Sequence, residues 1–256
     1  EIYTLSLHDA LPIWVFAGGN SPDQPALAVF DETAWIAIRD PWNSYSVRSY
    51  TPGEGFHDWQ WLQGILATPP RIAACPNGDI YVAGKDAWNG VWTRRYRSSS
   101  ASWQPWKFAG GIIAGAPSLA CGADNAAYIT ARDLSHNMWM ARVAQELTVD
   151  WYYGAGIFDG DLQIVRSGPL LYVVGLSSSA PWYRTWLAGF GWFDTWRSPG
   201  GILISFTHTV YNGYLYIAGQ DPSGNLYWWS TLSGTWRHYG NKNIAAGSSI
   251  AACGRS

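Results

Sequence analysis

The chain has 256 residues, a formal net charge of −2, and more aromatic residues (16%) than charged ones (13%). This composition leaves no basic field that could neutralise a phosphate backbone, so it argues against nucleic acid as a ligand. No window approaches the roughly 20 uninterrupted apolar residues of a membrane span. The 18 Trp, 15 Tyr and 28 Gly favour short twisted strands joined by tight turns, and we therefore expect an all-β fold.

The first 13 residues, EIYTLSLHDALPI, resemble a translated sequencing-adapter segment and are left out of the fold prediction. The alternative is that they form a genuine edge strand. If they are an adapter, the gene extends upstream and any signal peptide is missing, since the N-terminus shows no basic-then-apolar signal pattern. On this interpretation the chain is a metagenomic fragment of a bacterial protein, which we expect to be secreted or held at the cell surface.

Residues 14–256 carry a repeat of about 45 residues, which predicts a single domain. An aromatic residue shortly before a glycine opens each unit, at spacings of 47, 45, 45, 45 and 43 residues; these residues are Trp14, Trp61, Trp106, Trp151, Trp196 and Tyr239. A second landmark follows 25 to 27 residues later, at Asp40, Asp86, Asp133, Ser177 and Asp221. Each landmark stands five residues after an aromatic side chain, namely Trp35, Tyr81, Tyr128, Tyr172 or Tyr216.

The second repeat shows how each unit divides into strands. Its alternating apolar residues predict strands at 71–75, 80–85, 91–96 and 103–108. Asn89-Gly90 fits a type I′ hairpin turn between the second and third strands, because both central residues of that turn need positive φ. Four short antiparallel strands in about 45 residues is the geometry of one blade of a β-propeller.

We place the repeat units at about 14–60, 61–105, 106–150, 151–195 and 196–238, with a partial unit at 239–256. Five blades are complete in this division. The fourth strand of a preceding blade begins at Trp14, and the first strand of a following blade spans 244–253. Half a blade would leave unpaired strand edges, which β proteins avoid. We therefore expect a fragment of a six- or seven-bladed ring.

The run WQPWKFAGG, APSLACGAD, AYITARD and NMWMAR, within residues 103–142, resembles the repeat of bacterial lectin propellers related to the Photorhabdus lectin, and more distantly that of tectonin-type propellers. The resemblance extends over residues 14–253. It implies non-catalytic binding of glycans in pockets between neighbouring blades, commonly of fucose or related monosaccharides. The paired aromatics of the fourth strand are shifted at Trp59/Trp61 and reduced to Thr148/Trp151, so the repeats have diverged.

Aromatic side chains are the first candidates for sugar contact, because sugar sites stack a ring on the apolar face of the sugar. Trp42, Trp88 and Trp182 lie at or near predicted hairpin tips, where an exposed indole is tolerated mostly where something binds. The alternative is that they fold down on a neighbouring blade. Third-strand aromatics complete this set, at Trp92, Trp139 and Tyr183. We expect the aromatics that open each unit to pack between blades.

Arg48, Arg95 and Arg142 recur on the predicted third strand. A guanidinium fork suits paired sugar hydroxyls or a carboxylate, which makes these arginines candidate sugar contacts. The alternative is a structural role, in which each arginine pairs with the landmark carboxylate of its own repeat, at Asp40, Asp86 or Asp133. The sequence leaves both interpretations open.

Cys75, Cys121 and Cys253 share one register in the first strands of different blades. We expect them to lie too far apart to bridge one another and to pack as small hydrophobic residues. The five histidines share no register, and none stands with a nucleophile and an orienting acid. The sequence thus predicts no cofactor, no metal site and no catalytic residue.

The leading functional prediction is a multivalent lectin-type propeller with several glycan pockets. The second is a structural or protein-interaction propeller, acting as one module of a larger surface or toxin protein or of an oligomer. The third and less favoured is a glycoside hydrolase, whose paired carboxylates would come from distant blades.

Overall fold

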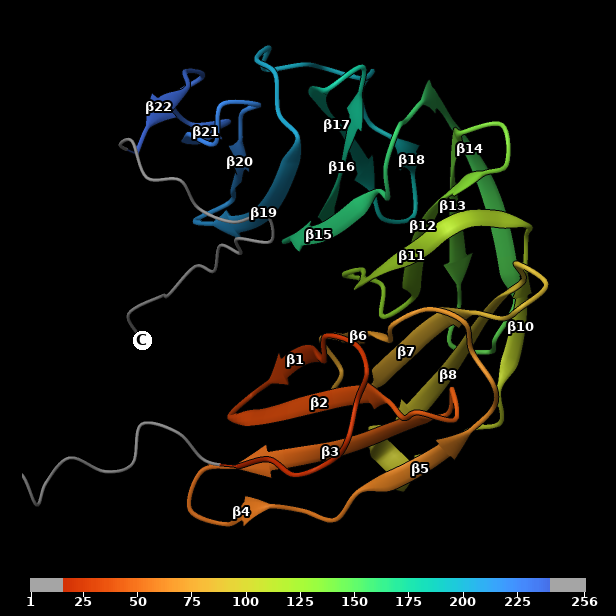
Figure 1. Ribbon diagram of the computed structural model, residues 1–256. Coiled ribbons are helices and arrows are strands. Elements are labelled where there is room, and N and C mark those ends of the chain that lie inside the picture. The colour runs from red at the N-terminus through yellow and green to blue at the C-terminus, as the bar shows by residue number, and fades with distance from the viewer. Residues whose placement is uncertain (1–15, 240–256) are drawn as a thin grey trace, which may run out of the picture.

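The computed structural model describes residues 16–239. Their strands form five antiparallel sheets, placed one after another around a common axis as the blades of a β-propeller (Figure 1). Each blade has four strand positions, from an inner strand at the axis to an outer strand at the rim. In the first two blades the outer position is divided between two short strands. The predicted all-β propeller with five complete blades is confirmed.

The strands of the first three blades have the following bounds. Blade 1 contains β1 (Ala26–Phe30), β2 (Thr33–Arg39), β3 (Tyr45–Thr51), β4 (Gly55–Phe56) and β5 (Gln60–Gln63). Blade 2 contains β6 (Arg71–Ala74), β7 (Ile80–Lys85), β8 (Val91–Arg97), a 3-10 turn (Ser98–Ser100), β9 (Ser102–Trp103) and β10 (Lys107–Gly110). Blade 3 contains β11 (Ile113–Cys121), β12 (Ala127–Asp133), β13 (Asn137–Val143) and β14 (Val149–Ile157).

The remaining two blades complete the described chain. Blade 4 contains β15 (Gln163–Ser167), β16 (Leu170–Ser177), β17 (Ala180–Leu187) and β18 (Gly191–Trp192). Blade 5 contains β19 (Ser205–Tyr211), β20 (Tyr214–Gln220), β21 (Leu226–Ser230) and β22 (Arg237–His238). The interpretations of residues 1–13, of Trp14 and of the partial unit at 240–256 lie outside the described residues.

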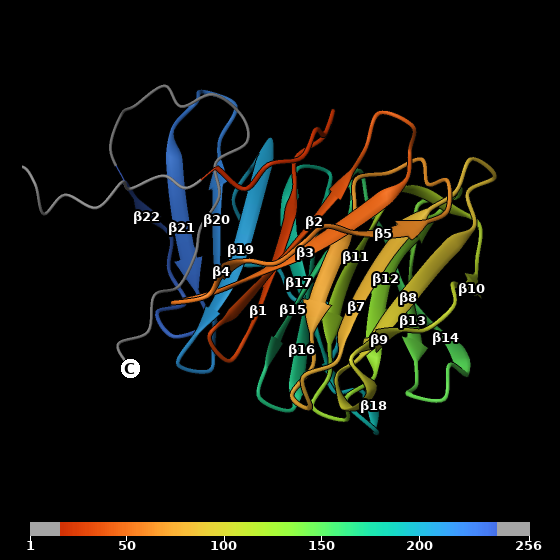
Figure 2. The same cartoon turned by 90° about the horizontal axis from the view of Figure 1, so that it is seen from below.

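The first three strands of blade 2 follow their predicted bounds closely, whereas the predicted fourth strand at 103–108 is divided into β9 and β10. The turn between β7 and β8 also differs. The predicted type I′ turn is wrong, because of its two central residues only Asn89 has a positive φ, of 68°. The tip is instead a longer loop closed by Asp86, whose backbone N–H donates to the Gly90 carbonyl at 2.9 Å. The strands run between two opposite faces of the propeller, where the turns lie (Figure 2).

Neighbouring blades are held together by a tryptophan of the outer strand. The indole Nε1 of Trp106 donates to the carbonyl of Leu62 in the preceding blade at 2.8 Å. The indole of Trp151 donates likewise to Ala109 at 2.7 Å. A Cβ at Gly111 would come within 2.8 Å of the Trp151 ring, which explains the glycine that accompanies each tryptophan. The expected packing between blades is confirmed for these two indoles.

Trp196 makes the same contact, with its Nε1 2.8 Å from the Gly154 carbonyl. In blades 1 and 5 the predicted residue is wrong. Trp59 and Trp236 occupy this position there, since Trp59 lies against Gly18 and Gly19 while Trp236 donates to Pro199 and Gly200 at 3.1 Å. Trp61, which was expected to pack between blades, is exposed at the rim.

Cys75 and Cys121 form a disulfide, with their Cα atoms 5.0 Å apart. The prediction that these cysteines lie too far apart to bridge is therefore wrong. Inner strands of neighbouring blades converge at the axis, where β6 contacts β11, so equivalent positions come within bridging distance. The predicted burial of both cysteines is confirmed. Cys253 lies outside the described residues.

Candidate functional site

One face of the propeller, here called the upper face, carries both the tips between second and third strands and the linkers that lead from one blade to the next. Each linker is tied to the tip of the blade it leaves. The backbone N–H of Leu66 donates to the Asn43 carbonyl at 2.8 Å, and that of Ile113 donates to the Asn89 carbonyl at 3.0 Å. Phe158 and Leu203 bond the tips of blades 3 and 4 in the same way. Hydrogen bonds therefore join the tips and linkers into one continuous edge of the upper face, which we call the upper rim.

The landmark aspartates organise these tips. Asp86 Oδ1 accepts the backbone N–H groups of Trp88 and Gly90 at 2.9 and 2.8 Å, and Oδ2 accepts the Trp92 indole N–H at 2.7 Å. Asp133 does the same in blade 3, where Trp139 is the indole donor at 2.9 Å. Burial opposes charge on Asp133, but these hydrogen bonds outweigh it and hold its pKa below the ordinary value. The landmark carboxylates thus shape the tips.

A hollow that we call the rim notch occurs at the same place in blades 3 and 5. It lies between the entering linker, the landmark aspartate, the third-strand aromatic and the outer-strand tryptophan. In blade 3 its volume is about 270 Å³ and its lining is Gly111, Ile112, Ile113, Asp133, Trp139 and Trp151. In blade 5 its volume is about 450 Å³ and its lining is Gly201, Ile202, Leu203, Asp221, Pro222, Ser223, Tyr227 and Trp236. The two notches are built from corresponding residues.

An exposed isoleucine marks each linker. It follows a glycine in all four linkers between the described blades, and its exposed fraction is 61–73%; these residues are Ile65, Ile112, Ile157 and Ile202. These isoleucines were not among the predicted contacts, because only aromatic and charged side chains were expected to bind sugar. The recurrent Gly-Ile step was the signal in the sequence that would have identified them.

The third-strand aromatics lie at the register of this notch, except that in blade 4 the residue at this register is Trp182 and not the predicted Tyr183. Trp92 pairs with Gly84 and Trp139 pairs with Ala131, and the residue at this register in blade 4 is Trp182, opposite Gly175. Trp182 therefore lies within β17, near the hairpin tip as predicted, but it is half-buried against the core and not exposed. Tyr183 points to the other face of the strand, because side chains alternate.

Tyr183 packs between blades. Its ring lies 5.4 Å from that of Trp229 in blade 5, and it also stands 6.5 Å from Tyr172 in its own blade. The third-strand series on the upper rim is thus Trp92, Trp139, Trp182 and Tyr227.

Trp42 and Trp88 are true tip residues, with exposed fractions of 79% and 83%. Trp42 borders a second hollow of the upper face, of about 620 Å³, together with the exposed Trp61. The Trp61 indole donates to the Ser44 hydroxyl at 2.6 Å, which fixes its ring against the tip. Blade 1 therefore presents two indoles side by side on one hollow.

Arg95 and Arg142 lie at the opposite, lower face, away from these indoles. Arg95 donates through Nε to Asp79 Oδ2 at 2.9 Å, and the two side chains are only 5% and 2% exposed. Arg142 pairs with Asp124 at 3.0 Å. The expected partners, the landmark aspartates, are wrong, because they stand at the other end of the third strand. The pairs form instead with carboxylates of the turn between first and second strands.

Arg48 belongs to a different series from the other two candidate arginines. It lies opposite Ile36, as Arg94 lies opposite Val82, so it sits on the other face of the third strand from Arg95. Arg48 donates to the carbonyls of His57 and Ala17, and Arg94 to those of Gln104 and Leu62. Arg184 makes the corresponding pair of hydrogen bonds to backbone carbonyls in blade 4. The structure therefore does not bring Arg48, Arg95 and Arg142 together with the tip tryptophans.

Two further observations bear on the chemistry of residues 16–239. Within them, no group of three or more His, Cys, Asp and Glu side chains is arranged to hold a metal ion. No helix among them is long and apolar enough to cross a membrane.

Solved structures with a similar fold include two lectins. The SapL1 lectin, solved in complex with α-methyl fucoside, is 12% identical with a TM-score of 0.59, and the match covers 85% of this chain and 79% of that one. The fungal lectin of Aleuria aurantia, described as a six-bladed β-propeller with a novel fucose recognition mode, is also 12% identical with a TM-score of 0.59, covering 88% and 81%.

A polysaccharide lyase, Uly1, is also similar, at 10% identity and a TM-score of 0.54, covering 78% of this chain and 55% of that one. At these identities the similarity shows the fold. The sequence itself matches no protein-family model and no curated protein. The fold is thus shared with fucose-binding lectin propellers, while the relation to the Photorhabdus and tectonin repeats stays a prediction.

Proposed function

We propose that the chain is a non-catalytic carbohydrate-binding propeller whose sugar sites are the rim notches of its upper face. The observation that carries this proposal is the isoleucine exposed at one register in four successive linkers. Burying such a side chain is worth about 1.5–3 kcal/mol. The isoleucine side chain is nevertheless exposed to water in all four linkers, which favours a surface that binds a ligand.

The chemistry of the notch suits a monosaccharide with an apolar face. In blade 3, the Ile112 side chain and the Trp139 ring supply apolar surface. The Asp133 carboxylate is engaged by the tip, so it fixes the wall of the notch. Because the notch is shallow, we expect weak binding at each site. A 6-deoxy sugar such as fucose fits this surface, since its methyl group adds apolar contact with the isoleucine.

Several weak sites on one rigid rim would act together on a dense glycan surface, because linked binding events raise the effective concentration of the next. The tip indoles Trp42 and Trp88 stand on the same face and are available to a longer glycan. The disulfide between Cys75 and Cys121 supports a secreted or cell-surface location, where thiols are oxidised.

Glycan-array binding of the purified chain tests the proposal, with fucosylated glycans expected among the ligands. The double variant Ile112→Ser/Ile202→Ser should lower binding about tenfold or more, because it removes apolar contact from two sites and so lowers avidity. Phe190→Ser is the matched control, since Phe190 is an exposed apolar residue of the lower face. An equal loss in both variants, or no glycan bound by the chain, would contradict the proposal.

The two rival functions predict other outcomes of the same work. A protein-interaction propeller would bind no glycan and would lose a protein partner when Trp42 or Trp88 is replaced. A carbohydrate-active enzyme would turn over a polysaccharide or a chromogenic glycoside, and a cleft carboxylate would be required.

A further inference from the structure

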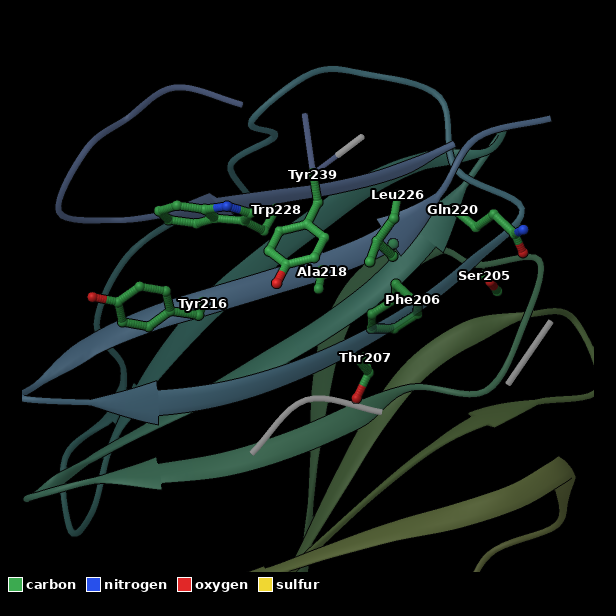
Figure 3. Close-up of a pocket in the computed structure, with 10 residues that line it drawn as sticks. Ser205, Phe206, Thr207, Tyr216, Ala218, Gln220, Leu226, Trp228 and Tyr239 are labelled. Atoms are coloured by element: carbon green, nitrogen blue, oxygen red, sulfur yellow. The ribbon is translucent and has the colours of Figure 1, made fainter. Parts of the chain in front are cut away.

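The face of blade 5 that points away from blade 4 is an apolar wall that no other blade within residues 16–239 covers. At the equivalent position in the preceding blades, the aromatic five residues before the landmark is covered by the next blade; Tyr128, for example, is fully buried with its ring 6.2 Å from Trp186. Tyr216 has the same register and instead lines an open hollow of about 370 Å³. Figure 3 shows the lining side chains on this face, among them Phe206, Tyr216, Ala218, Leu226, Trp228 and Tyr239.

Blade 1 presents the opposite wall of the same sector. Leu27 on β1 pairs with Ile36, and its counterpart Ile72 on β6 pairs with Val82. Ile72 is 8% exposed because blade 1 covers it, whereas Leu27 is 64% exposed. Along the described inner strands, contacts run from β1 through β6, β11 and β15 to β19, which leaves one sector open between blades 5 and 1 (Figure 1). Both walls of that sector are apolar.

Residues 16–19 already occupy the rim of this sector as an outer strand would. The Ala17 carbonyl accepts a hydrogen bond from Arg48, as the Leu62 carbonyl at the end of β5 accepts one from Arg94. Gly18 and Gly19 have positive φ, of 70° and 89°, and lie against Trp59. Gly110 and Gly111 lie against Trp151 with φ of 81° and 76°. Blade 1 therefore packs on this segment as each later blade packs on its predecessor.

The sequence after blade 5 repeats the inner strand of blade 3. Residues 244–253 read IAAGSSIAAC and residues 112–121 read IIAGAPSLAC, with five identities in ten positions. The described counterpart, β11, contacts β6 and β7 of the preceding blade and buries Ile113, Leu119 and Cys121 in a core shared with Tyr81. The residue of blade 5 that corresponds to Tyr81 is Tyr216, at the open hollow.

We propose that residues 244–253 occupy the open face of blade 5 as the inner strand of a sixth blade. Residues 16–19 then take the outer position of that same blade. In this arrangement the hollow beside Tyr216 is the seat of a strand of this chain and is not a ligand pocket.

A new disulfide tests the proposal, because the pair between blades 2 and 3 supplies a template. Cys75 lies two residues beyond Ala73, the partner of Tyr81, and Tyr211 lies two residues beyond Thr209, the partner of Tyr216. Tyr211→Cys should therefore form an intramolecular disulfide with Cys253. Peptide mapping without reduction should recover that pair in most of the protein. An intact Cys75–Cys121 disulfide in the same map shows that the variant has folded.

Ser167→Cys is the matched control, since Ser167 has the same register in blade 4, two residues beyond the Tyr172 partner Val165. In this variant Cys253 should remain a free thiol. The proposal is overturned if, in Tyr211→Cys, the introduced thiol and Cys253 both stay reduced. It is also overturned if these two thiols join two chains in a dimer, which would place a second copy on this face.

A second measurement does not depend on new cysteines. Ala251 corresponds to Leu119, which faces the preceding blade, so Ala251→Asp should lower Tm by several degrees. Ser248→Asp adds the same charge at the position of Ala116, which is not buried, and should leave Tm unchanged. Equal Tm values for Ala251→Asp and the unaltered chain would refute the seating of this segment.

Discussion

The arginine–aspartate pairs of blades 2 and 3 occupy corresponding positions but differ strongly in burial. Asp79 accepts Nε and Nη2 of Arg95, and the side chains are 2% and 5% exposed. Asp124 accepts Nε of Arg142 at 3.0 Å, and these side chains are 22% and 27% exposed. Asp79→Asn should lower the free energy of unfolding by about 3–5 kcal/mol, because it leaves the Arg95 charge buried and uncompensated.

The same change in blade 3, Asp124→Asn, should cost only about 1 kcal/mol, since water reaches the Arg142 charge. Urea unfolding of both variants, with the disulfide intact, measures the two losses. In Asp79→Asn/Arg95→Met the buried charge is gone, and most of the lost stability should return. If the two single variants lose equal stability, or if the double variant is as unstable as Asp79→Asn, the reasoning from burial is refuted.

Three further predictions concern stability. Burial lowers the pKa of His208 to about 4, whereas the unfolded chain binds this proton near pH 6.5. The free energy of unfolding should therefore fall by about 3 kcal/mol as the pH drops from 6.5 to 4. Unfolding titrations should show that His208→Leu abolishes most of this pH dependence. Cys75→Ser/Cys121→Ser should lower unfolding free energy by about 4 kcal/mol, because the disulfide closes a loop with a sequence separation of 46; a loss below 1 kcal/mol in urea would contradict this. Trp151→Phe should cost at least about 1 kcal/mol in the same assay, since it removes the bond to Ala109, whereas Trp42→Ala at an exposed tip should leave stability within about 0.5 kcal/mol.

The repeat could be predicted from the sequence because the strands of each blade are determined by residues that lie close together in the chain. Alternating apolar residues and turns predicted strand β7 at its observed bounds and placed β6 and β8 within one residue of theirs. What failed was counting across loops of unequal length. The hairpin that includes β4 shifts the outer strand of blade 1, so Trp59 fills the place that spacing assigned to Trp61.

Errors of one residue had larger consequences on the third strand, because neighbouring side chains point to opposite faces. Arg48 and Arg95 look equivalent by spacing, yet backbone pairing places them on different faces. Local sequence patterns give no information about the distances between blades. This is why the bridge between Cys75 and Cys121 was missed although their shared register was recognised.

The rim notch was found only in part for a similar reason. Trp92 and Trp139 were predicted from their recurrence, but the linker isoleucines carry no polar chemistry that a sequence search would select. Their significance comes from exposure, which requires the folded chain: Ile112 is exposed although the adjacent Ile113 lies in the core.

A crystal structure of the chain with methyl α-fucoside tests the central claim most directly. We expect sugar density in the notches of blades 3 and 5, with the sugar between the linker isoleucine and the third-strand aromatic, at Ile112 and Trp139 and at Ile202 and Tyr227. Sugar bound only elsewhere, for example on the lower face beside Arg95, or empty notches at saturating fucoside, would contradict the account.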